Sequence, residues 1–94
     1  MILGSHMKFN LGWLIITTAT LQTLTLDEIC LALDRHILGQ WGDLSDHDRA
    51  ANELALSTGS RLLSVYHTGS GMEFRVLTTG DRFTTTMYLS TELV

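Results

Sequence analysis

The sequence predicts an α+β domain in which two helices pack on a mainly antiparallel four-stranded sheet, with the element order β-α-α-β-β-β. Three observations support this prediction. Apolar residues alternate with other residues near the N-terminus, as they do in a strand. Two N-capping patterns are each followed by helical apolar spacing and a closing glycine. The last third is rich in threonine and divided by glycine-containing turns, which is typical of strands joined in hairpins.

The first strand is predicted over residues 8–17. Every second residue from Phe9 to Ile15 is apolar, and these side chains share one face of a strand. Trp13 belongs to this set and is expected in the core. The threonine-rich residues 17–20 end the strand, and a short helical turn is expected at 21–24.

The first helix is predicted over about residues 26–38. Thr25 and Glu28 have the spacing of a capping box, in which each side chain binds the other residue's backbone amide. Ile29, Leu33 and Ile37 recur every four residues and form an apolar stripe. Gly39 is suited to the left-handed conformation that ends many helices.

The second helix begins after Ser45 and ends at Gly59. Ser45 to Asp48 form the predicted cap, with Asp48 in the place of the usual glutamate. The apolar stripe of this helix consists of small residues and one leucine: Ala50, Ala51, Leu54 and Ala55. Small side chains predict a close approach to the sheet or to the first helix.

Three further strands are predicted over residues 61–68, 72–79 and 82–89. The turns between them are Gly69-Ser70-Gly71 and Gly80-Asp81. Tyr66, Phe74 and Tyr88 lie on these strands and allow two interpretations. They could stack on nucleic-acid bases or pack beneath the helices, and the scarcity of basic residues favours packing.

Length and composition indicate one folded domain. Residues 1–6 resemble the remnant of a cleaved affinity tag, so the domain is expected over 7–94. Hydrophobic residues make up 45% of the 94 residues and charged residues 17%. No apolar run approaches the roughly 20 residues of a membrane span. One cysteine and the lack of an export signal favour the cytoplasm.

The charge of the chain bears on its partners. The net charge is −4, with one lysine and five scattered arginines. Nucleic-acid-binding domains usually carry a clustered basic face, so nucleic acid is not an expected partner. An acidic protein can still bind a basic surface of another protein.

The densest polar cluster surrounds the start of the second helix. It consists of acidic residues and one histidine: Asp43, Asp46, His47, Asp48 and Glu53. Three aspartates could hold a hard cation, but their spacing lacks the order of an EF-hand. Capping of the helix amides accounts for the same residue types. The capping interpretation is favoured, and no metal site is expected.

The other reactive side chains give no strong sign of chemistry. His36, His47 and His67 lack the spacing of zinc ligands, and each is expected to be a surface or capping histidine. Cys30 lies beside the apolar stripe of the first helix and is expected to be a small core residue. The turn glycines are not followed by a phosphate-binding motif. No cofactor is therefore expected.

Trp41 is the most informative single residue. It lies in the loop Gly39-Gln40-Trp41-Gly42-Asp43 between the two helices. A loop tryptophan either fills the core or is exposed as a binding hot spot. Burial is the favoured interpretation, and exposure remains the alternative.

Several motifs together carry a family resemblance, and they cover nearly the whole of residues 7–94 in order. They are Met7-Lys8-Phe9-Asn10-Leu11-Gly12, Arg35-His36 with Gly39-Gln40-Trp41-Gly42-Asp43, residues 48–56, Arg61-Leu62-Leu63-Ser64-Val65-Tyr66, and Asp81-Arg82 with Thr85-Thr86. The chain resembles a family of small, mostly uncharacterised bacterial proteins that are labelled plasmid-related or hypothetical. This resemblance implies a place on plasmids, prophages or integrative elements. It implies no catalytic residues.

Three hypotheses of function follow. The first is a non-enzymatic accessory of a mobile element that binds a host protein, such as a defence nuclease or a CRISPR effector. Its predicted binding residues are one aromatic and four acidic residues: Trp41, Asp43, Asp46, Asp48 and Glu53. The second is a small enzyme or enzyme subunit that uses His67, Asp81 and Arg82. The third is a structural protein that dimerises through an exposed sheet edge.

Overall fold

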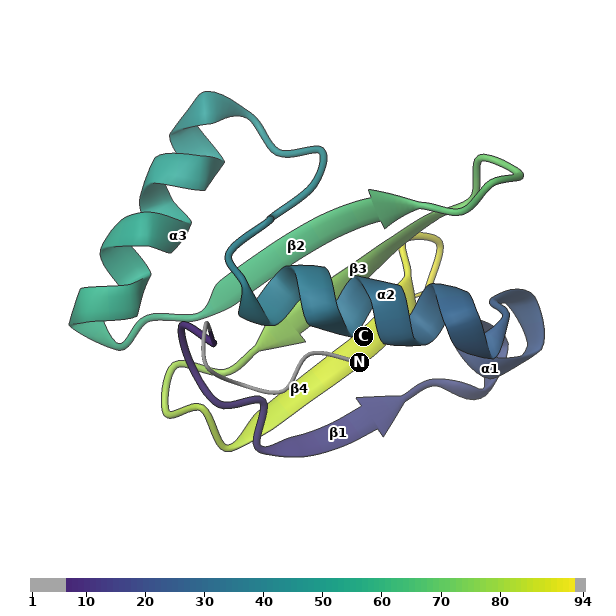
Figure 1. The fold of residues 1–94 in the computed structure, drawn as a ribbon, viewed down its shortest axis with the longest axis horizontal. Helices are drawn as coiled ribbons and strands as arrows, with labels where there is room; N and C mark the ends of the chain where they lie inside the picture. The colour runs from purple at the N-terminus through teal and green to yellow at the C-terminus, as the bar shows by residue number, and fades with distance from the viewer. Residues whose placement is uncertain (1–6, 93–94) are drawn as a thin grey trace.

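The computed structural model describes residues 7–92, so the tag remnant predicted at 1–6 lies outside the described residues. Seven elements follow one another along this part of the chain (Figure 1). They are β1 (Trp13–Ile16), α1 (Thr18–Thr23), α2 (Leu26–Ile37), α3 (Asp46–Thr58), β2 (Leu62–His67), β3 (Glu73–Thr78) and β4 (Thr84–Leu89). The α+β class is confirmed. The predicted helical turn at 21–24 is the end of a third helix, α1.

The four strands form one sheet in the order β1-β4-β3-β2. Strands β2, β3 and β4 are antiparallel, as predicted, and their register pairs Tyr66 with Phe74 and Val76 with Met87. Strand β1 is parallel to β4, with Trp13 opposite Thr84. The sheet is therefore mixed, because the β1–β4 pair is parallel and the other two pairs are antiparallel.

Strand β1 is shorter and more exposed than the sequence predicts. Gly12 has φ +67°, and a side chain there would collide with the backbone of Arg82 and Phe83, so the extended run begins only at Trp13. The prediction that Trp13 lies in the core is wrong, because its side chain is 72% exposed. It shares a face with Thr84, whereas α2 covers the opposite face of the sheet.

Helix α2 lies along the sheet and builds the main core (Figure 1). The capping box is confirmed, since the Glu28 amide donates to Thr25 Oγ1 at 3.1 Å and the Thr25 amide donates to Glu28 Oε1 at 2.9 Å. Ile29 and Leu33 are buried against the strands, as the four-residue spacing predicts. Their partners from the sheet are Tyr66, Phe74, Val76, Met87 and Leu89.

Helix α3 stands beside β2 and does not lie across the sheet (Figure 1). Ser45 caps its start through the Asp48 amide, and Gly59 ends it at φ +77°, both as predicted. The predicted apolar stripe is mostly wrong, because Ala50, Ala51 and Leu54 are exposed and only Ala55 is buried.

The buried polar residue Asn52 explains the position of α3. Its amide nitrogen donates to the Leu63 carbonyl at 2.7 Å, and its amide oxygen accepts from the Leu63 amide at 3.2 Å. Both backbone groups of Leu63 on the open side of β2 are thereby satisfied, as a further strand would satisfy them. The helix is therefore fixed to the edge of the sheet by a side-chain amide.

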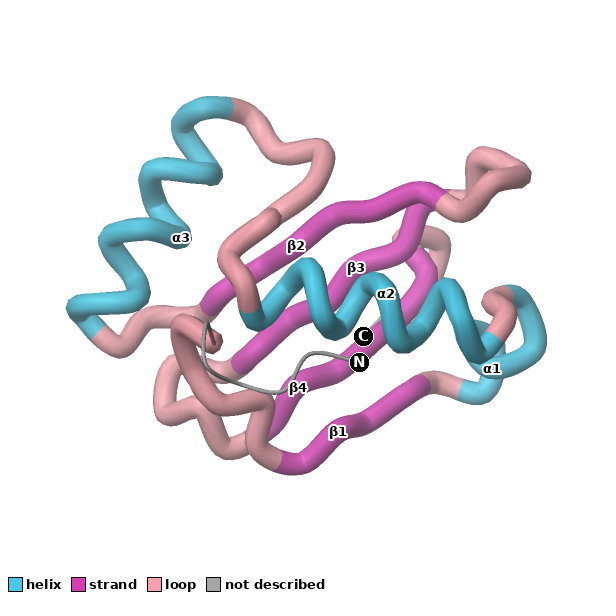
Figure 2. The backbone as a smooth tube through the Cα atoms, in the orientation of Figure 1, coloured by secondary structure: helices cyan, strands magenta, loops and turns pink. Residues whose placement is uncertain are grey.

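The loop between α2 and α3 runs beside β2 and closes the rest of that edge (Figure 2). The Val65 amide donates to the Trp41 carbonyl at 3.0 Å, and the Asp43 amide donates to the Val65 carbonyl at 2.8 Å. Gly42, between them, has φ +78° and lies against the ring of Tyr66. Only glycine fits here without strain, since a Cβ atom would lie 2.7 Å from a ring carbon of Tyr66.

Gly42 is required both for its positive φ and for the lack of room for a side chain. Comparison with Gly71 separates these two effects. Both residues have positive φ, but a Cβ atom at Gly71 would meet no atom within 4 Å. We expect Gly71→Ala to cost about 1 kcal/mol of unfolding free energy through backbone conformation alone. Gly42→Ala should cost about 3 kcal/mol, because overpacking adds to this. Urea denaturation of both variants measures the difference, and equal losses would contradict the close packing of this loop.

Candidate functional site

Trp41 fills a second, smaller core between the helices and the sheet. Its side chain is 2% exposed and packs with Ala55 and Leu62. Its ring stacks on Phe9 with centroids 6.2 Å apart and meets the edge of His36 at 5.7 Å. The interpretation of Trp41 as a core residue is confirmed, and its alternative role as an exposed binding anchor is wrong.

His36 is fully buried, although the sequence suggests a surface or capping histidine. Its Nδ1 lies 2.6 Å from Ser64 Oγ, and its Nε2 lies 2.9 Å from Thr78 Oγ1. Burial, together with the nearby charge of Arg82, lowers the pKa of His36 to about 3. The imidazole is therefore neutral at physiological pH.

The hydrogen bonds around His36 can have only one direction. Thr85 Oγ1 donates to the Leu11 carbonyl at 2.7 Å, so its single proton is used there. Thr78 Oγ1, 2.7 Å from Thr85 Oγ1, must then donate to it. Thr78 consequently accepts from Nε2–H of His36, and Nδ1 accepts from Ser64. The chain of donors runs from Ser64 through His36, Thr78 and Thr85 to Leu11.

This serine–histidine contact resembles part of a hydrolase site, but the surroundings exclude that role. Ser64, His36 and Thr78 have no exposed surface, so a substrate cannot reach them. Every donor in this series of hydrogen bonds has its acceptor within the core. The arrangement is a structural network that ties α2 to three strands.

The buried neutral state of His36 predicts loss of stability in mild acid. The unfolded chain binds a proton near pH 6.5, whereas the folded chain does so only near pH 3. The contribution of His36 to the unfolding free energy is therefore complete above pH 6.5 and is lost progressively as the pH drops from 6.5 toward 3. Between pH 7 and pH 5 we expect the unfolding free energy to fall by about 2 kcal/mol on account of His36.

Urea denaturation at each pH measures this loss, and a His36→Gln variant should lack most of it. The matched control is His47→Gln, which changes an exposed histidine of α3 and should keep the wild-type pH dependence. A His36→Gln variant with the full dependence would contradict the assignment.

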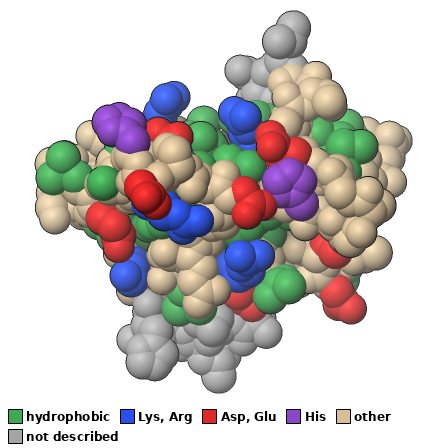
Figure 3. Space-filling view, turned by 90° about the horizontal axis from the view of Figure 1, so that it is seen from above, with side chains coloured by type: hydrophobic (Ala, Val, Ile, Leu, Met, Phe, Trp, Pro, Cys, Tyr) green, Lys and Arg blue, Asp and Glu red, His purple; other side chains and the backbone are tan. Residues whose placement is uncertain are grey.

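The four predicted acidic binding residues are exposed, but they do not form a single patch. Asp46 and Glu53 are two turns apart and share a face of α3. Asp48 lines a groove beside the helix, and Asp43 lies 2.7 Å from His67 Nδ1. Acidic and basic side chains are interspersed on the face shown in Figure 3. Within residues 7–92, no three acidic, histidine or cysteine side chains gather as metal ligands do.

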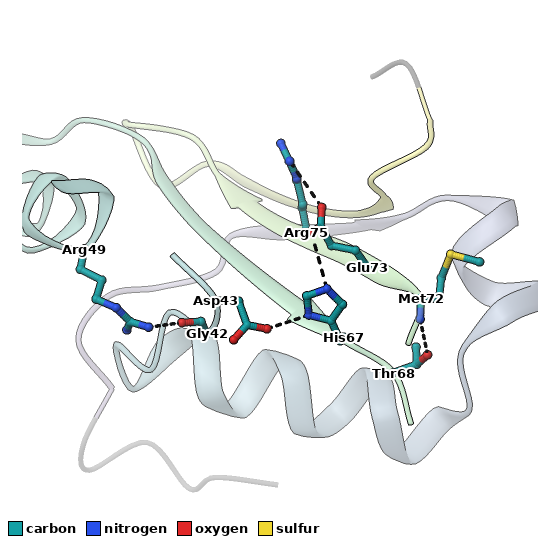
Figure 4. Close-up of polar contacts among 8 residues, drawn as sticks. All are labelled: Gly42, Asp43, Arg49, His67, Thr68, Met72, Glu73 and Arg75. Carbon is teal, nitrogen blue, oxygen red and sulfur yellow. Dashed lines mark hydrogen bonds and ion pairs between the residues drawn. The ribbon is translucent and has the colours of Figure 1, made fainter. Parts of the chain in front are cut away.

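His67 belongs to a row of surface charges at one end of the sheet (Figure 4). Asp43 Oδ2 lies 2.7 Å from His67 Nδ1, and Glu73 Oε1 lies 3.7 Å from His67 Nε2. Arg75 continues the row with an ion pair of 3.5 Å to Glu73. These exposed pairs contribute little stability because water screens them.

The hypothetical enzyme residues do not converge. His67 pairs with Glu73 at the end of β2, whereas Asp81 and Arg82 follow β3 beside the opposite end, where Leu62 pairs with Thr78. Asp81 accepts from the Thr79 hydroxyl and the Phe83 amide. These bonds hold the pKa of Asp81 below its usual range and fix the turn. The set therefore forms no common site.

Arg82 instead fastens α3 to the β3–β4 turn. Its Nη2 donates to the Ala55 carbonyl at 2.9 Å, and its Nη1 donates to the Ser60 carbonyl at 2.6 Å. The carbonyls of Thr79 and Gly80 accept from the same Nη1 at 3.2 Å. A planar guanidinium can bind these groups together, whereas an ammonium cannot.

We expect Arg82→Lys to lower the unfolding free energy by about 1–2 kcal/mol, because charge-assisted hydrogen bonds are lost. The last turn of α3 should also exchange its amide protons faster. Arg61→Lys is the matched control on the loop after α3, where the side chain is exposed. Equal losses in the two variants, measured by urea denaturation and hydrogen exchange, would contradict the role of Arg82.

An open groove of about 450 Å³ runs between α3 and β2. Its apolar lining includes Leu44, Leu54 and Leu63, with Asp48 and Arg61 as charged members. Leu54 is 65% exposed, so α3 presents a large apolar side chain beside the groove. Sequence reasoning assigned Leu54 to the core. The buried place on α3 is taken instead by the polar residue Asn52, whose role depends on its hydrogen bonds to Leu63 and leaves no signal in the sequence.

A second exposed apolar surface lies at the opposite edge of the sheet. Its residues are Trp13, Leu14 and Ile15 of β1, together with Phe83, and Leu14 lies on the opposite face of the strand from Trp13 and Ile15. Their exposed fractions are 72, 42, 48 and 64%, in that order. Large apolar patches on a small protein are typical of contact sites. The sequence signal is that residues 9–26 carry no charged side chain.

Comparison with known proteins gives no relatives for this chain. It matches no protein-family model, and no curated protein or solved structure is significantly similar to it. Within residues 7–92, none of the helices has the length and apolar character needed to cross a membrane. The exposed surfaces are therefore the structural features that bear on function.

Proposed function

We propose that this protein is a non-enzymatic accessory of a mobile genetic element that acts by binding a host protein. An inhibitor of a defence system, of the anti-restriction or anti-CRISPR type, is the form that we favour. The resemblance to plasmid-related proteins motivates the mobile element. The support for protein binding is the exposure of α3.

The single observation that carries the proposal is how little of α3 is buried. Of its 13 residues, only Asn52 and Ala55 are buried. The rest of the helix presents Leu54, with Asp46 and Glu53 on the neighbouring surface. Leu54 differs from other exposed leucines because it borders the groove whose apolar lining includes Leu44 and Leu63. A partner side chain in this groove would cover all three leucines.

The chemistry of α3 indicates the kind of partner. Burying Leu54 in a pocket would contribute about 1.5–3 kcal/mol, enough for an anchor residue. Asp46 and Glu53 would face basic side chains around that pocket and favour fast association. A nucleic-acid-binding groove on a defence protein has this basic character. Leu54 thus takes the role of apolar anchor that the sequence suggested for Trp41.

The proposal includes a cytoplasmic location, where restriction and CRISPR proteins act. Cys30 is the one cysteine, so the sequence encodes no internal disulfide, which is typical of a reducing compartment. His67 and Asp43 lie at the far end of β2 from the α3 groove residues Ser60 and Arg61. Asp43 is therefore a peripheral member of the binding surface.

The test is the establishment of incoming plasmid or phage DNA in bacteria with active restriction and CRISPR systems. Cells that express the protein should accept the DNA more often, and a defence protein should co-purify with it. Leu54→Asp should weaken both effects on the order of 10- to 100-fold, because a charge replaces the apolar anchor.

The matched control is Leu26→Asp, which makes the same change at a leucine of α2 that is 74% exposed. It should keep both effects. The proposal is wrong if the wild type neither protects DNA nor retains a defence protein, or if Leu54→Asp behaves like Leu26→Asp. Folding of each variant is checked by its urea unfolding transition.

A further inference from the structure

Strand β1 leaves one edge of the sheet open. The Trp13 amide donates to the Phe83 carbonyl at 2.8 Å, and the Thr17 amide donates to the Met87 carbonyl at 3.1 Å. Backbone groups alternate in direction along a strand, so those of Leu14 and Ile16 point away from β4. Among residues 7–92, no strand pairs with this side of β1.

Apart from its short length of four residues, this edge lacks the features that usually prevent pairing. Natural edge strands carry charges, prolines or bulges that keep other strands away. Here residues 9–26 contain neither a charged residue nor a proline. Trp13 and Ile15 are exposed on one face of β1, and Leu14 is exposed on the other. An added strand would bury apolar side chains on both faces.

We infer that β1 pairs with β1 of a second copy of this chain, in an antiparallel arrangement about a two-fold axis beside Ile15. The distribution of charge favours a second copy as the chain that covers this edge. Each chain carries a net charge of −4, so two copies repel each other wherever their acidic residues meet. Residues 9–26 form an uncharged stretch, and β1 lies within it.

The directions of the backbone groups fix the register of this pairing. Leu14 of each copy lies opposite Ile16 of the other, and each such pair exchanges two backbone hydrogen bonds. Ile15 then faces Ile15 of the second copy across the axis. Both copies place α2 on the same side of a continuous eight-stranded sheet, because residues opposite each other share a face.

The other edge of the sheet explains why assembly stops at two copies. The backbone of Trp41 and Asp43 pairs with Val65, and the side chain of Asn52 binds Leu63. Strand β2 therefore offers no free edge to a third chain. One open edge per chain gives a closed dimer and not a fibre.

The oligomeric state is measured on the wild-type chain by sedimentation equilibrium and light scattering from about 1 to 200 μM. We expect a reversible monomer–dimer equilibrium. Ile15→Lys should weaken dimerisation on the order of 100-fold, because two ammonium groups would face each other at the axis. Leu26→Lys is the matched control at another exposed leucine and should leave the equilibrium unchanged.

Cysteine cross-linking tests the register in a Cys30→Ser background. Ile15→Cys should form an intermolecular disulfide under mild oxidation, since directly opposite residues without backbone hydrogen bonds have Cα atoms about 4.5 Å apart, which a disulfide can span. Trp13→Cys should not, because Trp13 lies opposite Thr17 of the second copy.

Three results would overturn the inference: a monomer at all concentrations, a dimer unaffected by Ile15→Lys, or cross-linking at position 13 in preference to 15. These results are independent of the proposed function. Leu54→Asp alters α3 at the other edge of the sheet and should dimerise like the wild type.

Discussion

The neutral imidazole of His36 is the interaction on which the rest of the fold depends. It joins α2 to β2 through Ser64 and to β3 through Thr78. Thr85 carries the chain of hydrogen bonds on to β4 and the segment that leads into β1. The His36 ring also contacts Trp41, which packs against Ala55 of α3. Protonation of His36 would therefore disturb contacts of both the helices and the sheet.

The sequence predicts those parts of the fold that depend on neighbouring residues. The Thr25–Glu28 capping box, the ends of α2 and the β2–β3 hairpin depend on short-range patterns, and the structure contains all three. Burial of His36 and exposure of Trp13 depend on which faces meet across the sheet, so spacing alone could not predict them. The same limit applies to α3. Asn52 resembles a surface residue until Leu63 lies beside it.

The candidate surfaces lie at the two edges of the sheet. Leu54 of α3 stands beyond β2, and Ile15 belongs to β1 at the other edge. The sheet order keeps them apart, so contacts at one surface leave the other accessible. A pair of chains joined at β1 would present two copies of α3 at its far ends. Such an assembly could hold two host proteins, or two sites of one, with a gain in avidity.

The pairing of β1 with β4 also has a consequence for synthesis of the chain. Trp13 pairs with Thr84, so β1 emerges from the ribosome long before its partner exists. At about 5–20 residues per second, the intervening residues take roughly 4–14 s to make. During this interval an uncharged, apolar segment has no strand of its own chain to bind. An unpaired apolar strand of this kind is prone to associate with other chains, so β1 is most exposed to wrong pairing before β4 has been made.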